Sequence, residues 1–138
     1  MNYVILVSHG EFAQGLHQAL TMFVGEREDV VSIGLRKDED VDHLALRMED
    51  MMQGFQEEDQ FLILGDLIGG SPLTTMLNCM EKNGFLKQSV VVGGMNLAMA
   101  LNAVLMKEDL QQAKEMALSE GKTAIKELQL SNEEEDEI

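Results

Sequence analysis

The sequence predicts an α/β fold: a three-layer α/β/α domain around a central, mainly parallel sheet of four strands. Four short runs rich in Val, Ile and Leu, bounded by Gly and Asp, are typical of strands buried on both faces. Between these runs, apolar residues recur at the spacing of three and four that marks an amphipathic helix. Strands that alternate with helices form right-handed βαβ units, and such units build a parallel sheet.

The predicted elements follow one another regularly along the 138 residues, a length that suits a single domain. The strands cover residues 3–7, 30–35, 61–64 and 90–92, and the helical patterns cover residues 12–23, 41–55, 73–80, 95–106 and 109–118. Gly121 marks the predicted end of the last helix. Residues 122–126 fit either an extension of that helix or a short edge strand, because their lysines suit a strand at an edge.

The composition excludes several classes of protein. The formal net charge is −15, and ten Lys and Arg spread along the chain cannot form the basic face that nucleic acid requires. The single cysteine, Cys79, allows neither a disulfide nor a cysteine pair with metal-ligand spacing, and we expect no metal and no cofactor. We find neither a signal peptide nor an apolar run of about 20 residues. These features predict a soluble, cytoplasmic protein.

The acidic run at residues 133–137 repels itself and is typical of a solvated tail. We therefore expect residues 1–128 to form the domain and residues 129–138 to form a disordered acidic tail.

The most informative residue is His9, in the segment Ser8-His9-Gly10-Glu11, where the first strand runs directly into a helix. Such a junction lies at the carboxyl end of a parallel sheet, where open α/β folds gather their chemistry. The amino end of the following helix offers backbone N–H groups to an anion. This placement predicts a nucleophilic imidazole. His17 and His43 lie within helical patterns and are expected to be ordinary, partly exposed residues.

Two further junctions have a similar composition. The segment from Gly65 to Pro72 reads Gly-Asp-Leu-Ile-Gly-Gly-Ser-Pro, and residues 93–96 read Gly-Gly-Met-Asn. Adjacent glycines let the backbone approach a ligand closely, and Ser71 suits the N-cap of a helix that has Pro72 at its first position. Neither a P-loop nor a dinucleotide-binding fingerprint is present, so binding of a nucleoside triphosphate is not predicted.

The residues at these junctions suit a phosphoryl group carried on histidine. If Asp66 accepts a hydrogen bond from Nδ1 of His9, Nε2 keeps its lone pair and faces outward as the nucleophile. Helix amino ends and the Ser71 hydroxyl would then stabilise charge on the phosphoryl oxygens. A hydrolase triad of Ser71, His9 and Asp66 is a weaker alternative. A nucleophile elbow has the sequence Gly-x-Ser-x-Gly, whereas here Pro72 follows Ser71 directly and makes the serine look like a helix cap.

The chain resembles the enzyme IIA component of mannose-type sugar phosphotransferase systems. The likeness rests on Ser8-His9-Gly10, on the segment from Gly65 to Pro72 and on residues 93–97, and it covers roughly residues 1–128. It implies a cytoplasmic phosphocarrier that takes a phosphoryl group from the phosphohistidine of the carrier protein HPr and passes it to a IIB domain. Membrane subunits IIC and IID then import the sugar.

The resemblance also assigns residues. It implies that His9 is the transient phosphohistidine and Asp66 its hydrogen-bonded partner, and that the phosphoryl pocket contains Gly10, Gly69, Gly70 and Ser71. It further implies a homodimer that exchanges a carboxyl-terminal strand, which would fall within residues 121–128.

Two alternatives within the resemblance stay open: a regulatory IIA-like module of a transcriptional regulator, and the phosphocarrier subunit of dihydroxyacetone kinase. The intact Gly-Gly-Ser-Pro motif favours the sugar-transport branch. Because the chain ends in an acidic tail and not in an Ala- and Pro-rich linker, we expect IIB to be a separate polypeptide. The sugar itself is not predicted, since such a carrier touches only phosphoryl groups.

Overall fold

Four parallel strands form the central sheet in the order β2-β1-β3-β4. In the computed structural model, which describes residues 1–130, the strands are β1 (Asn2–His9), β2 (Val30–Leu35), β3 (Gln60–Gly65) and β4 (Ser89–Gly93). Every neighbouring pair runs parallel. The predicted four-stranded sheet is therefore confirmed, and each strand contains the apolar run that predicted it.

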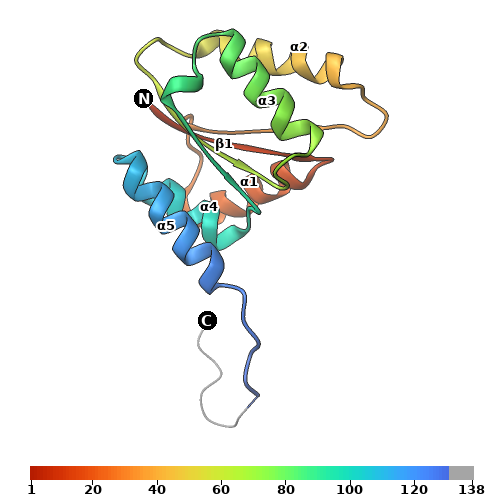
Figure 1. Cartoon of the computed structure of the whole chain (residues 1–138). Coiled ribbons are helices and arrows are strands. Elements are labelled where there is room, and N and C mark those ends of the chain that lie inside the picture. The colour runs from red at the N-terminus through yellow and green to blue at the C-terminus, as the bar shows by residue number, and fades with distance from the viewer. Residues whose placement is uncertain (131–138) are drawn as a thin grey trace.

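Helices cover both faces of the sheet (Figure 1). α2 (Val41–Met51) and α3 (Ser71–Lys82) lie on one face, and α1 (Phe12–Val24), α4 (Leu97–Leu105) and α5 (Leu110–Thr123) lie on the other. Two short 3-10 helices, η1 (Met52–Gly54) and η2 (Leu86–Gln88), follow α2 and precede β4. The step from β1 to β2 runs opposite to the later steps along the sheet, so right-handed crossovers place α1 opposite α2 and α3.

Each face of the sheet has its own apolar core, because successive residues of a strand point to opposite faces. In β1, Val4 and Leu6 belong to the core under α1, α4 and α5, whereas Ile5 and Val7 belong to the core under α2 and α3. All four side chains are completely buried. Burial on both faces explains why the strands are continuously apolar and do not alternate with polar residues.

The strand order places the topological switch point of the sheet at the carboxyl ends of β1 and β3. β2 lies on one side of β1 and β3 on the other, so the chain leaves β1 and β3 toward opposite faces of the sheet. Open α/β sheets bind ligands at such a point. β1 ends at His9, and Asp66 follows β3 directly, with its backbone N–H bonded to the Val7 carbonyl at 3.1 Å.

Two helix boundaries differ from the prediction because tertiary contacts replace helical ones. The pattern predicted one helix over residues 41–55, but α2 ends at Met51, and Phe55 lies beyond η1 with its ring 4.7 Å from that of Phe61. Met95 was predicted to be helical, but its N–H bonds the Gly65 carbonyl at the end of β3. α4 therefore starts two residues later.

Of the two alternatives for residues 122–126, the extension of the last helix is confirmed as far as Thr123, so Gly121 does not end this helix. α5 continues to Thr123, and a Cβ on Gly121 would lie 3.0 Å from the Met99 Cε. The glycine thus permits close packing of α5 on α4 and does not break the helix.

Residues 125–130 leave the body of the molecule without regular secondary structure (Figure 1). Ile125, Leu128 and Leu130 are all exposed. The predicted exchange of a strand between subunits stays a prediction, and the acidic run at residues 133–137 lies outside the described residues.

Candidate functional site

The site is built from the ends of two neighbouring strands. The Nδ1 of His9 lies 2.8 Å from Oδ2 of Asp66, and the same oxygen accepts the His9 backbone N–H at 2.9 Å. The second oxygen, Oδ1, accepts the backbone N–H of Leu67 at 2.8 Å. The structure thus brings together the two side chains that the sequence predicted to face each other.

The Asp66 carboxylate is held in its charged form. Burial alone would raise the pKa of Asp66, but the hydrogen bonds from His9 and Leu67 outweigh burial and hold this pKa below its ordinary value. An ionised carboxylate only accepts hydrogen bonds, so we infer that Nδ1 carries the proton and Nε2 keeps its lone pair. The imidazole side chain is 47% exposed, whereas that of Asp66 is 14% exposed. Asp66 therefore orients the ring through Nδ1, while much of the imidazole remains exposed to solvent.

The loop between β3 and α3 passes close to the imidazole. A Cβ built on Gly70 would lie 3.0 Å from Cε1 of His9, so the loop can pass at this distance because the residue is glycine. Gly69 has a φ of 86°, a conformation that also favours glycine. The geometry of this loop therefore explains why residues 69 and 70 of the predicted pocket are both glycine.

Ser71 is not the N-cap that the sequence predicted. The first intrahelical bond of α3 runs from the Thr74 N–H to the Gly70 carbonyl, which makes Gly70 the N-cap and Ser71 the first helical residue. Pro72 was expected at the first helical position and is the second residue of α3, still within its first turn. Ser71 is exposed, and its hydroxyl has no capping role.

Sequence reasoning missed the role of Ser8. This residue is completely buried, and its Oγ donates to the His9 carbonyl at 2.9 Å and accepts the Ala13 N–H at 2.7 Å. Ser8 therefore ties the backbone of His9 to the first turn of α1. The available signal was a serine just before a helix, which is typical of capping.

Gly10 shapes the turn after His9. Its φ is 56°, and its N–H bonds the Leu35 carbonyl of β2 at 2.7 Å. The Gly10 carbonyl lies 2.1 Å from the place where Gly34 would carry a Cβ, so a side chain on Gly34 would collide with this turn. The ends of β1 and β2 are thus in direct backbone contact.

The third predicted junction, at residues 93–96, packs against the loop that follows β3. A Cβ on Gly93 would lie 2.3 Å from Cγ1 of Ile68, so Ile68 of the loop after β3 packs directly against the Gly93 backbone. Asn96 caps α4 by accepting the Met99 N–H at 2.8 Å, and its Nδ2 donates to the Gly121 carbonyl at 3.0 Å.

The other two histidines lie apart from the His9–Asp66 pair. Nδ1 of His17 meets the Ser32 hydroxyl at 2.9 Å, and Nδ1 of His43 meets Glu39 Oε2 at 2.5 Å. Across residues 1–130, no cluster of His, Cys, Asp and Glu has the arrangement of a metal site.

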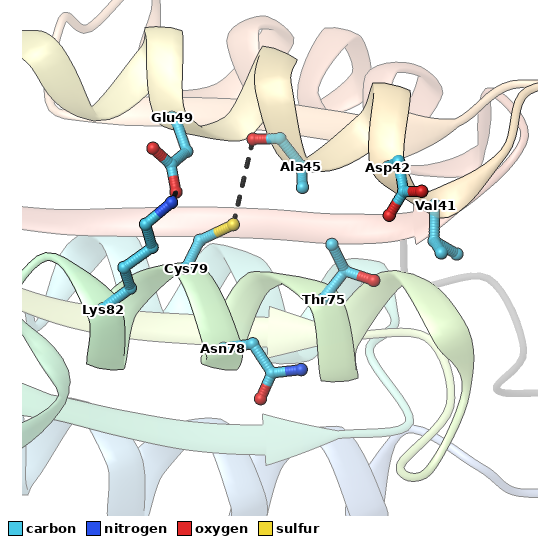
Figure 2. A pocket seen from close by; sticks show the side chains of 8 residues that line it. All are labelled: Val41, Asp42, Ala45, Glu49, Thr75, Asn78, Cys79 and Lys82. Carbon is cyan, nitrogen blue, oxygen red and sulfur yellow. Dashed lines mark hydrogen bonds and ion pairs between the residues drawn. The ribbon is translucent and has the colours of Figure 1, made fainter.

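A hollow of about 250 Å³ lies between α2 and α3 and contains the one cysteine (Figure 2). Sγ of Cys79 points to the Ala45 carbonyl at 3.8 Å, and Lys82 pairs with Glu49 at 3.2 Å. Burial raises the pKa of the Cys79 thiol. A buried thiol with a raised pKa is a poor nucleophile, so this hollow does not compete with the His9 site.

The fold and the site together define a class of protein. Its members are open, parallel α/β domains in which a carboxylate orients a histidine at the carboxyl ends of the strands, where the strand order reverses. The chain belongs to the EIIA-man family, since the family model described as the PTS (phosphotransferase system) fructose IIA component matches residues 3–119.

Individual relatives agree with this family. The PTS fructose-specific EIIA component of Bacillus subtilis (strain 168) is 24% identical over 107 residues, which cover 78% of this chain and 71% of that protein. The mannose/sorbose-specific IIA subunit from Enterococcus faecalis has a TM-score of 0.81 at 25% identity, covering 95% of this chain and 97% of that one. The EIIA component from Streptococcus agalactiae has a TM-score of 0.77 at 24% identity, covering 92% and 97%.

Family and fold support a phosphocarrier role in a sugar phosphotransferase system. Among the helices of residues 1–130, none is long and apolar enough to cross a membrane.

Proposed function

We propose that the protein carries a phosphoryl group on Nε2 of His9, receiving it from phosphorylated HPr and passing it to a IIB protein or domain. The observation that carries this proposal is the 2.8 Å contact between His9 Nδ1 and Asp66 Oδ2 at the open edge of the sheet. In the neutral ring this contact places the proton on Nδ1, so that the lone pair is on Nε2, which is the tautomer a nucleophilic imidazole requires. Membership of the EIIA-man family supports HPr and IIB as the partners in general.

The transfer itself needs few groups. Nε2 of His9 attacks the phosphorus, the bond from phosphorus to the donor imidazole breaks, and its electron pair returns to the donor nitrogen. Positive charge then develops on the His9 ring, and the Asp66 carboxylate stabilises it through Nδ1–H. The second transfer reverses these bonds: the IIB nucleophile attacks phosphorus, and the electron pair of the breaking bond returns to Nε2.

The amino end of α3 is the proposed cradle for the phosphoryl oxygens. The backbone N–H groups of Ser71 and Leu73 precede the first intrahelical bond, and Pro72 has no N–H to offer. Gly70 brings this helix end close to the imidazole, and the exposed Ser71 hydroxyl lies beside it in sequence. The Gly10 N–H already bonds Leu35, so we propose that Gly10 shapes the pocket and does not donate to the phosphoryl group.

The hydrolase alternative finds no support in the geometry. A triad requires a hydrogen bond between the serine hydroxyl and the imidazole. Within the described part of the chain, the His9 ring bonds Asp66 and not Ser71. The regulatory and dihydroxyacetone kinase alternatives are less favoured, because the family model and the curated relative are both named for sugar phosphotransferase components.

The proposed carrier works in the cytoplasm and reaches the membrane subunits IIC and IID only through IIB. We also propose a homodimer in which residues 125–128, the part of the predicted segment 121–128 that lies beyond α5, pair with the partner's sheet. Support comes from β4, which pairs with β3 on one side only, and from the exposed apolar residues of the segment that follows α5.

The test is to mix the purified protein with phosphoenolpyruvate, enzyme I and HPr and to locate bound phosphate by mass spectrometry. We expect one acid-labile, base-stable phosphate on His9, and we expect an added IIB domain to remove it. No label on the protein, with HPr shown to be charged, would refute the proposal.

The three histidines of the chain provide matched controls. His9→Ala should abolish phosphoryl acceptance and leave the circular dichroism spectrum unchanged, because the exposed ring contributes little to the core. His17→Ala and His43→Ala should accept phosphate as the unmodified protein does. Acceptance by the His9→Ala variant would move the site to one of the other two residues.

A further inference from the structure

The Ser8 hydroxyl is a buried polar group next to the reactive histidine, and the proposed phosphoryl chemistry does not use it. Ser8 is completely buried, on the same face of β1 as the apolar residues Val4 and Leu6. A hydroxyl in such surroundings costs free energy unless it is hydrogen-bonded. Among residues 1–130, the other buried polar or charged residues are Asp59 and Lys107, and both form ion pairs. For Ser8, bonds to neutral backbone groups must compensate for burial.

Two such bonds join the end of β1 to the first turn of α1. The Ser8 Oγ donates to the His9 carbonyl at 2.9 Å and accepts the Ala13 N–H at 2.7 Å. Backbone N–H groups in the first turn of a helix have no intrahelical acceptor, and the N-cap residue Glu11 makes no side-chain cap bond. The Ser8 hydroxyl therefore takes the place of the missing cap, and it both donates and accepts.

The backbone of His9 is thereby held by a side chain at each of its polar groups. Asp66 Oδ2 accepts the His9 N–H at 2.9 Å, and Ser8 Oγ donates to the His9 carbonyl. The next residue is fixed as well, because the Gly10 N–H bonds the Leu35 carbonyl at 2.7 Å. Only two rotatable bonds connect the imidazole to this backbone, so the direction of Nε2 depends on how the His9 backbone is oriented.

The contacts of His9 with Asp66 need a second anchor. The ring Nδ1 and the backbone N–H of His9 both bond the same atom, Oδ2 of Asp66. Two bonds that meet in one atom permit a pivot of the histidine about that atom. The bond from Ser8 acts on the carbonyl, at the other end of the His9 backbone, and restricts this pivot.

We propose that Ser8 is a positioning residue for phosphoryl transfer, whose hydroxyl anchors the His9 carbonyl to the first turn of α1 and so keeps Nε2 in line with the phosphorus of the donor. This inference rests on the proposed function and adds a residue to it. Ser8 is completely buried, so it acts through His9 and does not touch the phosphoryl group. Alignment matters because a displacement of about 1 Å can slow a reaction by about 10²-fold.

The test compares Ser8→Ala with the unmodified protein, well below the melting temperature of both. We expect the maximal rate of transfer from phosphorylated HPr to fall about tenfold and the KM for phosphorylated HPr to stay within about twofold, because the ring and not the docking surface is disturbed. Phosphorylation by phosphoramidate, a small donor, should also slow by about tenfold, since it uses the same nitrogen. Ser8→Thr keeps the hydroxyl and should restore the maximal rate to within about threefold.

A matched control is Ser89→Ala. The Ser89 hydroxyl donates to the Phe85 carbonyl at 2.9 Å, at the start of β4 and thus at the opposite edge of the sheet from His9. This variant should transfer at the normal rate. Circular dichroism gives the folded fraction of each variant, because a loss of stability alone would leave the maximal rate per folded molecule unchanged. If Ser8→Ala does not fold, Ser8→Cys replaces it, and its weakly bonding thiol should also slow transfer.

The outcomes separate this inference from the function on which it rests. If the unmodified protein takes no phosphate from HPr, the proposed function fails, and the rates with phosphoramidate still decide the role of Ser8. If the folded Ser8→Ala or Ser8→Cys protein transfers at the rate of the unmodified protein, the positioning role is refuted. A raised KM with an unchanged maximal rate would also refute it, since Ser8 would then affect docking and not the ring.

Discussion

Asp66 uses its two oxygens for three hydrogen bonds, to the His9 ring, the His9 backbone and the Leu67 backbone. One side chain therefore fixes the position of the histidine, the tautomer of its ring and the start of the following loop. Because these bonds keep the pKa of Asp66 below its ordinary value, the carboxylate stays ionised throughout the neutral range.

This geometry makes a prediction for Asp66→Ala. The ring would lose its orienting partner and the proton on Nδ1 would no longer be fixed, so phosphoryl transfer should slow by about 10²-fold without being abolished. Rapid-quench measurement of transfer from phosphorylated HPr gives the rate, and ¹⁵N NMR of the ring reports the tautomer.

A suitable control is Asp50→Ala, which removes an exposed carboxylate of α2. It should transfer at the normal rate. An unchanged rate in Asp66→Ala, together with an unchanged tautomer, would contradict the orienting role of Asp66.

At the scale of elements, each loop at the carboxyl edge is supported by a neighbour. Ile68 packs against the Gly93 backbone, and the turn at Gly10 packs against Gly34. The loop at Gly70 lies against the His9 ring. A Cβ would collide with its neighbour at Gly34 and at Gly93, and a Cβ at Gly70 would crowd the His9 ring. The site is therefore a property of several strand ends and not of one motif.

The segment after α5 is the element whose structure depends most on a partner. Changing Ile125 and Leu128 to Asp should convert a dimer to a monomer, because charged residues oppose apolar burial and edge pairing between subunits. Analytical ultracentrifugation at concentrations of about 10 μM measures the change.

The comparison protein is Lys126→Asp, which alters a charge in the same segment but removes no apolar side chain. It should remain dimeric. A monomeric unmodified protein, or a doubly substituted protein that stays dimeric, would contradict the predicted exchange.

For the whole molecule, two carboxylates link stability to pH: the half-buried Asp29 and the buried Asp59. Burial favours a raised pKa for Asp29, but its bonds to Arg27 and Lys107 lower the pKa overall; burial likewise opposes the lowering at Asp59, where the Gln56 N–H and the terminal ammonium prevail. A carboxylate with a lowered folded pKa stabilises the fold above its unfolded pKa, near 4. That contribution is lost as the pH falls through the folded value.

We therefore expect the melting temperature to fall by roughly 10 °C between about pH 5 and pH 3. Asp29→Asn should cost about 2 kcal/mol at pH 7, because it leaves the buried Lys107 without its main partner. The difference between Asp29→Asn and the unmodified protein should shrink toward pH 2, since the unmodified Asp29 is then protonated. Thermal denaturation followed by circular dichroism at each pH measures both effects, and a pH-independent difference would contradict this linkage.

The sequence by itself determined the order of the strands and helices along the chain and singled out two residues of the candidate site. Periodicity and continuous apolar runs located every strand, because burial on both faces leaves a local signature. His9 and Asp66 stood out because each follows a strand directly, and strand ends in parallel sheets share one edge.

Only the tertiary structure decided which strands are neighbours, and with it the geometry of the site. Local periodicity contains no information on strand order, so the 2.8 Å contact of His9 with Asp66 and the approach of Gly70 to the His9 ring had to come from the packed sheet. The end of α2 at Met51 and the start of α4 at Leu97 were set in the same way, by contacts of Phe55 and Met95 with distant residues that outweigh local propensity.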